Sequence, residues 1–389
     1  MRFGYFANQN NRHNEKPYGQ VLDETIDLAR YLDQNSWSSI WFTEHHFGHE
    51  GFEVCPNPVM MSTWAAAHTE KLRIGQAANI ITFWNPLRFA EDLAMLDHMS
   101  KGRVDCGVGR GIYGREAVNL NKVADTRNPE QNFKLFRDSL EVIRRAWSGE
   151  YFDFDGEMMT IPEPGVLWDH AMSPKDKSYM DLETNEIQKL ALVPRPLQQP
   201  TPPLWQVVDS PLSIQFAAEN DLNCMMWIPP VDALKPRFEL YRDKRSEVLG
   251  KDVPLGKGVA LVRDMFVAET MEEAERLAGQ GIMDYLRWVC HWRGLGNHRH
   301  LGEELPETEG KLDLLSYEWL HPRNLLFGTP DYVAEKIEEL QSELNLETLL
   351  VWSHFPGVSH DAAMRSVKLF TEEVMPRFSG SGLNLQAAE

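Results

Sequence analysis

Two short turns in the sequence carry residue types that could bind an anion. In the turn GVGRG at residues 107–111, the glycines let a ligand approach the backbone and the arginine can pair with a phosphate. The spacing is not that of the dinucleotide fingerprint, and a tight structural turn explains the glycines equally well. The segment DSPLS at residues 209–213 opens a predicted helix, where N–H groups and hydroxyls can hold an anion, although N-capping is their commoner use. Because these turns follow neighbouring predicted strands, together they indicate one phosphorylated ligand.

The adjacent pair His45-His46 ends a predicted strand and has three possible uses. As a shared metal site it is poor, because neighbouring strand residues point to opposite faces and the His-x-His of a metal-dependent barrel hydrolase is absent. One of the two is expected to be a hydrogen-bonded core residue. The other is expected to point into the active-site mouth, as an acid, a base or a hydrogen-bond donor.

We predict no metal site elsewhere in the chain. The group His291, His298 and His300 has no acidic or thiolate companion nearby apart from Cys290, which favours a solvated or substrate-facing loop. The four cysteines lie far apart and form no C-x-x-C pair. This spacing argues against a zinc ribbon, a redox dithiol and a disulfide scaffold.

Five aromatic residues fall at the ends of predicted strands: Phe83, Trp84, Trp227, Trp352 and Phe355. Each of them alone would usually belong to the core. Five at the same end favour a substrate pocket wall for a planar or apolar ligand.

Short apolar runs alternate with helical patterns, as in parallel βα units. Strands are predicted at residues 2–6, 38–44, 72–81, 103–109, 204–209, 223–228, 258–268 and 347–353. Helices are predicted to begin after Asn128, Thr329 and Ser359, each of which can cap an amino terminus. The pattern predicts an α/β fold, a (β/α)8 TIM barrel with its active site at the carboxyl ends of the strands.

The length of the chain allows two or three domains, or one barrel with insertions. We predict one domain over residues 1–378, with insertions at about residues 163–190 and 291–320, and a disordered tail at residues 379–389. Loops this long often serve as lids or substrate walls, and a solvated insertion is the alternative.

The charge balance is strongly acidic, with 39 Lys+Arg against 58 Asp+Glu and a net charge of −19. Without a basic stripe, this excess argues against a nucleic-acid partner. We find no apolar run long enough to span a bilayer and no secretory signal at the amino terminus, and we therefore expect a cytoplasmic protein without a membrane partner.

On these residues the sequence resembles the bacterial luciferase-like family of flavin-dependent monooxygenases, and its pattern is most similar to the luciferase α subunit. The matching stretches occur in family order over nearly the whole chain: MRFGYF, IWFTEHHF, IGQAANI, NPLRFAEDLAMLDHMSKGR, GVGRGIY, PRPLQQPTPPLWQVVDSPLS, FGTPDYVAEKI and VKLFTEEVMP. The resemblance implies a luciferase-like TIM barrel that forms a homodimer and uses reduced FMN, supplied by a separate NAD(P)H:flavin reductase through diffusive transfer.

The chemistry that the resemblance implies is oxygenation. A C4a-peroxyflavin formed from reduced FMN and O2 would oxygenate a small, largely apolar organic substrate by hydroxylation or Baeyer–Villiger insertion. His45 matches the catalytic histidine of the family. The residues that match the cofactor-binding positions are Ala77, Ala78, Arg110, Ile112, Asp209, Ser210 and Ser213. Among these, the Ala77–Ala78 pair matches a non-prolyl cis peptide bond that supports the flavin ring.

The sequence also departs from luciferase. Trp227 stands where luciferase has a small hydroxyl residue, Val108 replaces its reactive cysteine, and the insertion at residues 163–190 is longer. Light emission therefore does not follow from the resemblance. Two alternatives remain open, an F420-dependent oxidoreductase on the same fold and a non-catalytic flavin-binding subunit.

Overall fold

The computed structural model describes residues 1–306 and 312–378, so the predicted tail at residues 379–389 lies outside the described residues. Eight parallel strands close into a barrel, because the first strand pairs with the last, Arg2 opposite Thr348. In order around the barrel, the strands are β1 (Arg2–Ala7), β2 (Ser39–Phe42), β3 (Arg73–Gln76), β5 (Val104–Gly109), β8 (Leu204–Val207), β9 (Asn223–Trp227), β10 (Val259–Val267) and β12 (Thr348–Trp352). The predicted TIM barrel is confirmed.

The predicted strands of the barrel sheet differ from the observed ones at two places, and the short hairpin strands β6 (Phe154–Asp155) and β7 (Thr160–Ile161) outside it were not predicted. The strand expected at residues 72–81 is divided into β3 and a two-residue β4 (Asn79–Ile80), with the Ala77–Ala78 bond between them. A further strand, β11 (Leu326–Gly328), pairs with the end of β10 and was not predicted. Three residues are too few to show a periodic pattern in a sequence.

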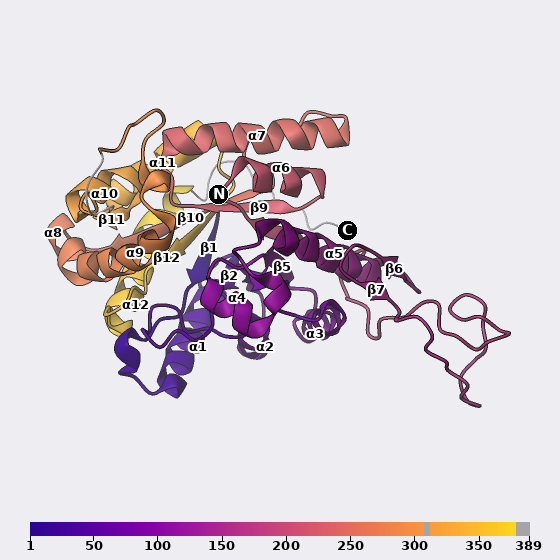
Figure 1. The fold of residues 1–389 in the computed structure, drawn as a ribbon. Coiled ribbons are helices and arrows are strands. Elements are labelled where there is room, and N and C mark those ends of the chain that lie inside the picture. Colours follow the sequence, from indigo (N-terminus) through magenta and orange to yellow (C-terminus); the bar gives the residue numbers. More distant parts are fainter. Residues whose placement is uncertain (307–311, 379–389) are drawn as a thin grey trace.

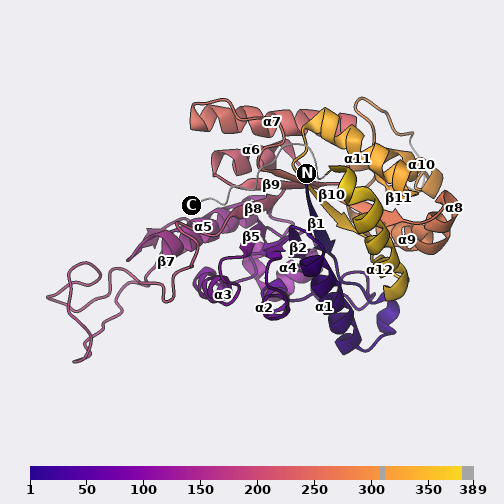
Figure 2. The same ribbon diagram turned by 180° about the vertical axis from the view of Figure 1, so that it is seen from behind.

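Helices surround the barrel (Figures 1 and 2). The longer ones are α1 (Tyr18–Gln34), α2 (Pro58–His68), α3 (Pro86–Met99), α5 (Pro129–Ser148), α6 (Pro211–Glu219), α7 (Val231–Leu249), α9 (Gln280–Arg293), α11 (Pro330–Leu344) and α12 (His360–Leu369). Shorter ones are α4 (Gly114–Leu120), α8 (Met271–Ala274) and α10 (Tyr317–Asn324). The predicted caps are confirmed, since the side chains of Asn128, Thr329 and Ser359 each accept a hydrogen bond from a backbone N–H of their helix.

The two predicted insertions have different structures. Residues 163–190 follow the short β6–β7 hairpin (Phe154–Asp155 and Thr160–Ile161) and extend away from the barrel as an exposed loop (Figure 1). The stretch at residues 291–320 is less irregular than expected, because α9 continues to Arg293 and α10 begins at Tyr317. Two of its described residues, Arg293 and Asn297, line the cavity described below.

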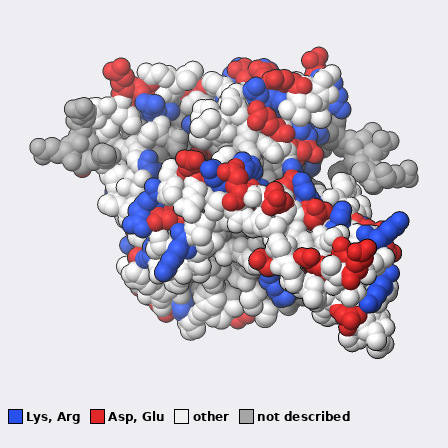
Figure 3. All heavy atoms as spheres, turned by 45° about the vertical axis from the view of Figure 1, so that its right-hand side comes forward, with Lys and Arg blue, Asp and Glu red and all other residues white. Residues whose placement is uncertain are grey.

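The acidic charge is spread over the surface. On the face shown in Figure 3, Asp and Glu side chains alternate with Lys and Arg, and neither sign forms a continuous patch. In the described part of the chain, no helix combines the length and the apolar character needed to cross a bilayer.

Candidate active site

A cavity opens at the carboxyl ends of the barrel strands, where the fold predicts an active site. The sequence-predicted residues that line it are His45, Ala77, Ala78, Arg110, Ile112, Asp209, Ser210, Ser213 and Trp227. They come from segments up to 182 residues apart, between His45 and Trp227, and only barrel closure brings them together. The structure therefore gathers all the predicted cofactor-binding residues and the predicted catalytic histidine into one site.

One end of this cavity is built to attract an anion. Helix α6 begins here with a capping box, in which Ser210 Oγ accepts from the Ser213 N–H at 3.2 Å and Ser213 Oγ accepts from the Ser210 N–H at 3.1 Å. The positive end of the helix dipole thus points at the cavity. Both serines serve as caps, and the same geometry supports anion binding.

Three arginines surround that helix end. The guanidinium of Arg110 lies 5.5 Å from the ring centroid of Phe133, and among the described residues no hydrogen bond or ion pair to it is present. Burial lowers the pKa of Arg110, and nearby Asp209 opposes that shift. Arg293 Nη1 lies 3.7 Å from Asp209 Oδ2, and Arg237 donates to Asn297 Oδ1 at 3.1 Å. Among the described residues, the partly buried guanidinium of Arg110 thus has no hydrogen-bond or salt-bridge partner, which suits an anionic ligand.

Arg293, Arg237 and Asn297 were missed at the sequence level. Arg293 and Arg237 lie on helices α9 and α7, and Asn297 lies in the short 3-10 helix Gly296–His298. No motif marks these positions in the sequence.

The backbone between β3 and β5 forms a flat wall of the cavity. The Ala77–Ala78 peptide bond is cis, as the family resemblance implied. Gly107 lies against this segment so closely that a Cβ atom there would stand 1.8 Å from the carbonyl oxygen of Gln76. Gly111 has a φ of +79°, which a side chain would disfavour. Gly107 is therefore required for the close approach of two strands, and Gly111 for the backbone conformation of the turn that follows.

The opposite end of the cavity is acidic and centres on His45. Its Nε2 lies 3.5 Å from Glu53 Oε1 and its Nδ1 lies 3.4 Å from Glu116 Oε1. Burial favours the neutral imidazole, but Glu53, Glu116 and Glu44 outweigh it and raise the pKa of His45 to about 9. His45 therefore carries a positive charge at neutral pH.

His46 has a different role, as expected for the second member of the pair. Its Nε2 lies 3.0 Å from Glu44 Oε1, and Glu44 also accepts from Trp84 Nε1 at 3.0 Å and from the Ile80 N–H at 2.7 Å. The backbone N–H of His46 donates to Glu116 at 2.8 Å. These bonds hold the strand ends together around His45.

Two buried tyrosines complete the acidic end, and both were missed at the sequence level. Tyr285 lines the cavity, and its hydroxyl donates to Glu53 Oε1 at 3.0 Å. The ring of Tyr113 lies 5.5 Å from that of His45. Burial, followed by the charge of Glu53, raises the pKa of both phenols, so both stay protonated. Tyr285 lies in the middle of α9, and its spacing from the other apolar residues of that helix predicts only that it is buried.

Four of the five predicted aromatic wall residues do not line this cavity. Trp227 does, and it packs between Phe6 and Tyr285. Trp352 and Phe355 are fully buried behind Tyr285, with the Trp352 ring 4.7 Å from the Tyr285 ring. Phe83 packs on His46, and Trp84 bonds Glu44, as described above. Trp352 and Phe355 therefore support the wall from behind, whereas Phe83 and Trp84 pack around His46 and Glu44.

Outside the cavity, Glu24, His354 and His360 are the only described His, Cys, Asp or Glu residues arranged closely enough to hold a metal ion. The ammonium of Lys16 lies 2.7 Å from Glu24, so a cationic group already occupies that carboxylate. His298 is buried, donates to or accepts from Cys290 Sγ at 3.5 Å, and lies 3.1 Å from the Asn324 amide. The expectation of a solvated or substrate-facing His298 is therefore wrong, because the 3-10 helix turns it into the core.

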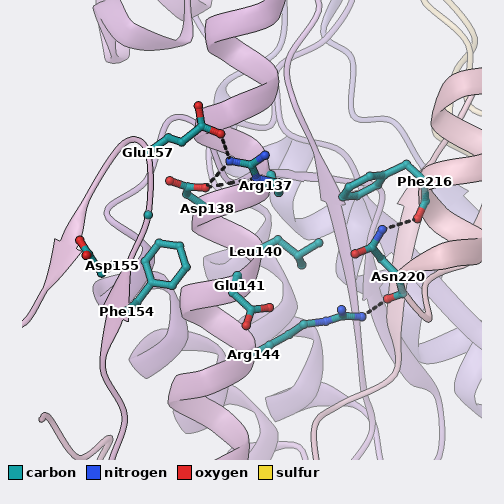
Figure 4. Close-up of a pocket in the computed structure, with 11 residues that line it drawn as sticks. Arg137, Asp138, Leu140, Glu141, Arg144, Phe154, Asp155, Glu157, Phe216 and Asn220 are labelled. Atoms are coloured by element: carbon teal, nitrogen blue, oxygen red, sulfur yellow. Dashed lines mark hydrogen bonds and ion pairs between the residues drawn. The ribbon is translucent and has the colours of Figure 1, made fainter.

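A second hollow lies between α5, α6 and the β6–β7 hairpin (Figure 4). Its cations are already engaged by the protein. Arg137 pairs with Asp138 and Glu157, and Arg144 donates to the carbonyl of Asn220. This hollow therefore differs from the barrel cavity, in which Arg110 has no such partner.

The fold and the site together are those of a TIM-barrel protein with a cavity suited to an anionic ligand. Residues 1–344 match the family described as luciferase-like monooxygenase, so this chain belongs to that family. The oxygenase component of a flavin-dependent trigonelline monooxygenase from Acinetobacter baylyi is 24% identical over 399 aligned residues, covering 100% of this chain and 98% of the relative. The family resemblance inferred from the sequence is confirmed.

Two solved structures share the fold over nearly the whole chain. A monooxygenase from Streptomyces bottropensis superposes with a TM-score of 0.76 at 23% identity, covering 97% of this chain and 100% of that one. The oxygenating constituent of 3,6-diketocamphane monooxygenase from Pseudomonas putida, a type II Baeyer–Villiger enzyme in complex with FMN, superposes with a TM-score of 0.75 at 24% identity, covering 97% and 98%.

Proposed function

We propose that this chain is the oxygenase of a two-component flavin-dependent monooxygenase and binds reduced FMN in the barrel cavity. The observation that carries the proposal is the partly buried Arg110, which lines the cavity with the amino terminus of α6 and His45 and has no salt-bridge partner among the described residues. A phosphate at this position would receive the Arg110 guanidinium and the helix dipole. The names of the relatives, several of them flavin-dependent or oxygenase components, support the same conclusion.

The residues present fit FMN. Arg110, Ser210 and Ser213 would hold the phosphate, and the backbone at Ala77–Ala78 would support the ring where the glycines leave room for it. When bound, reduced FMN would supply the two electrons that O2 activation requires.

The protein itself would contribute orientation, exclusion of water and a charge. Trp227, Tyr285 and Ile112 would wall the reacting end of the cavity. His45 would offer a hydrogen bond to an oxygen atom of the reactants, and its positive charge would stabilise negative charge developing there.

The substrate that we propose is a small, largely apolar organic molecule, oxygenated by hydroxylation or Baeyer–Villiger insertion. The aromatic wall of Phe6, Trp227 and Tyr285 supports this choice. The reductase that supplies the flavin would be a separate protein that delivers it by diffusion. We place the reaction in the cytoplasm, since all four cysteines are free and buried.

We also propose a homodimer. Helices α2 and α3 pack side by side and expose large apolar side chains: Met60, Trp64, Met95 and Met99. Exposed apolar groups on adjacent helices are typical of an interface. Trp64→Glu should then give a monomer in sedimentation velocity, whereas Met172→Glu, on the exposed loop at residues 163–190, should not.

Two measurements test the proposed function. Equilibrium titration should show that reduced FMN binds more tightly than reduced F420, and the reverse order would favour the deazaflavin alternative. With an NAD(P)H:flavin reductase, 18O2 and a panel of cyclic ketones and heteroaromatic compounds, mass spectrometry should find one 18O atom in a product. Binding of FMN with only hydrogen peroxide formed from every compound would favour a non-catalytic flavin-binding subunit.

A further inference from the structure

The two ring nitrogens of His45 both face carboxylate oxygens. Nε2 lies 3.5 Å from Glu53, in the loop after β2, and Nδ1 lies 3.4 Å from Glu116, on α4. A neutral imidazole has a single N–H and would leave one nitrogen lone pair facing an acceptor. An imidazolium has two N–H groups and places its positive charge against both carboxylates, although Nδ1 is buried and makes no hydrogen bond in the described structure. Two carboxylates within ion-pair distance of the ring favour the charged form.

Glu53 is held in place by a residue far away in the sequence. Its side chain is buried, and its Oε1 accepts a hydrogen bond from Tyr285 of α9 at 3.0 Å. An isolated buried carboxylate is costly, so it needs a compensating cation and a donor. His45 supplies the first and Tyr285 supplies the second.

We infer that Glu53, fixed by Tyr285, is a positioning residue that keeps His45 charged and orients it as a hydrogen-bond donor toward the cavity. The inference rests on the proposed function for its catalytic meaning, because the charge would act on an oxygen atom of the reactants. It assigns His45 the role of donor and excludes that of general base at neutral pH. Glu116, on the other side of the ring, lies within ion-pair distance of Nδ1, at 3.4 Å.

The contact lengths allow this role. Both exceed the 2.7–2.9 Å typical of charge-assisted hydrogen bonds, so each contact is loose. One N–H can therefore turn toward a ligand oxygen while the other carboxylate still neutralises the ring.

Charged and titratable groups from three segments face His45 or its partners. They are Glu44 and Glu53 from the loop after β2, Tyr113 and Glu116 from the start of α4, and Tyr285 and Arg293 from α9. Burial lowers the pKa of His45, but the three glutamates raise it to about 9, and the charge of Arg293 acts on Tyr113. Removing one glutamate should therefore lower the pH at which the ring loses its proton.

The experiment is an NMR titration of the flavin-free protein labelled with 13C and 15N at histidine, with His45→Gln to assign the signal. In the wild type, His45 should remain doubly protonated up to pH 8 or above. In Glu53→Gln, its midpoint should fall by at least one pH unit, a tenfold change in the acid constant. The matched control is Glu50→Gln, which removes a charge from the same loop where it pairs with Arg115, and it should leave the midpoint within 0.3 unit of the wild type.

Several results would overturn the inference. These are a wild-type midpoint near the ordinary value of about 6.5, or a midpoint that does not change in Glu53→Gln. If Glu53→Gln does not fold, Glu53→Asp, which keeps the charge but withdraws it by one methylene, should give an intermediate midpoint, and an unchanged midpoint would count against the inference.

A second readout links Glu53 to the chemistry. The rate at which O2 reoxidises bound reduced FMN should be constant with pH as long as His45 is charged. The pH at which this rate begins to change should be lower in Glu53→Gln than in the wild type. The FMN affinity at pH 6.5 should be the same in both proteins. Failure of the proposed function is a separate result. A protein that does not bind FMN but shows the shifted His45 would refute the oxygenase proposal and leave the ion pair established.

Discussion

The two ends of the barrel cavity hold charge in opposite ways. At one end, the unpaired guanidinium of Arg110 faces the amino terminus of α6, with Arg293 and Arg237 nearby. At the other end, Glu53 and Glu116 enclose a single cation, His45. The first end suits an anion from outside, whereas at the second end the carboxylates already face a cationic group of the protein.

The difference shows that net charge says little about a site. The chain has a net charge of −19, yet it places Arg110 and Arg293 in the same cavity as the amino terminus of α6. It also uses its excess of carboxylates, at the other end, to hold a proton near neutral pH. Local burial and contact distance decide both outcomes, because exposed charges are screened over about 10 Å.

The largest effect is expected from replacing His45 at the acidic end of the cavity. His45→Ala should lower the rate of substrate oxygenation about 1000-fold, within the range for loss of an acid–base group, and should change the FMN affinity by less than about threefold. Stopped-flow product formation and fluorescence titration measure the two quantities. His49→Ala, at an exposed histidine of the same loop, is the control and should alter neither. If His45→Ala lowered the oxygenation rate and the FMN affinity by the same factor, the two ends of the cavity would not act separately.

A buried carboxyl behind the same end gives a pH-dependent effect on stability. Burial raises the pKa of Asp264 to about 7, while Arg263 and Trp227 oppose the shift. The folded protein therefore binds more protons than the unfolded chain between about pH 4 and 7, so this group lowers stability as the pH rises through that window. The wild type should lose roughly 3 to 4 kcal/mol of its free energy of unfolding between pH 4.5 and 8 through this group, and Asp264→Asn should not show that loss.

Urea unfolding of the wild type and Asp264→Asn at pH 4.5 and pH 8 tests this. The stability of the variant relative to the wild type should increase at pH 8. A constant difference between the two proteins would mean that Asp264 is ionised in the folded state at both pH values.

The anion end should show its effect in binding. Arg110→Ala should weaken FMN binding about 30- to 100-fold, the value of one charge-assisted, partly buried contact, and riboflavin binding, which lacks the phosphate, should change little. Arg127→Ala, at an exposed arginine paired with Asp125, is the matched control. If Arg110→Ala weakened FMN and riboflavin binding by the same factor, Arg110 would act on the flavin ring and not on the phosphate.

The smallest effect is expected at the helix cap. Ser210→Ala should cost about 1 kcal/mol of stability and weaken FMN binding about fivefold, because the capping box and the anion site share its hydroxyl. Ser359→Ala removes the cap of α12 and should cost similar stability with no change in FMN affinity. If Ser210→Ala and Ser359→Ala bound FMN with equal affinity, Ser210 would only cap α6 and would not contact the phosphate.

The fold could be predicted because its signals are local. Apolar runs predicted all eight barrel strands, and capping residues such as Asn128 and Thr329 predicted where helices begin. The site could be predicted in part, at positions where a motif lies at a strand end, as at Arg110. The three-residue β11 and the wall residue Tyr285 could not, since neither leaves a pattern distinguishable from ordinary loop or core.

The sequence by itself determined the barrel, the family and part of the anion end, namely Arg110, Ser210 and Ser213, because strand periodicity, caps and glycine turns act over a few neighbours. Only the tertiary structure decided which aromatic residues face the cavity and which histidine is charged. Trp352 and Trp227 end similar strands, but only Trp227 reaches the cavity. The charge of His45 depends on Glu53, Glu116 and the distant Tyr285, which meet only when the barrel closes and excludes water from their contacts.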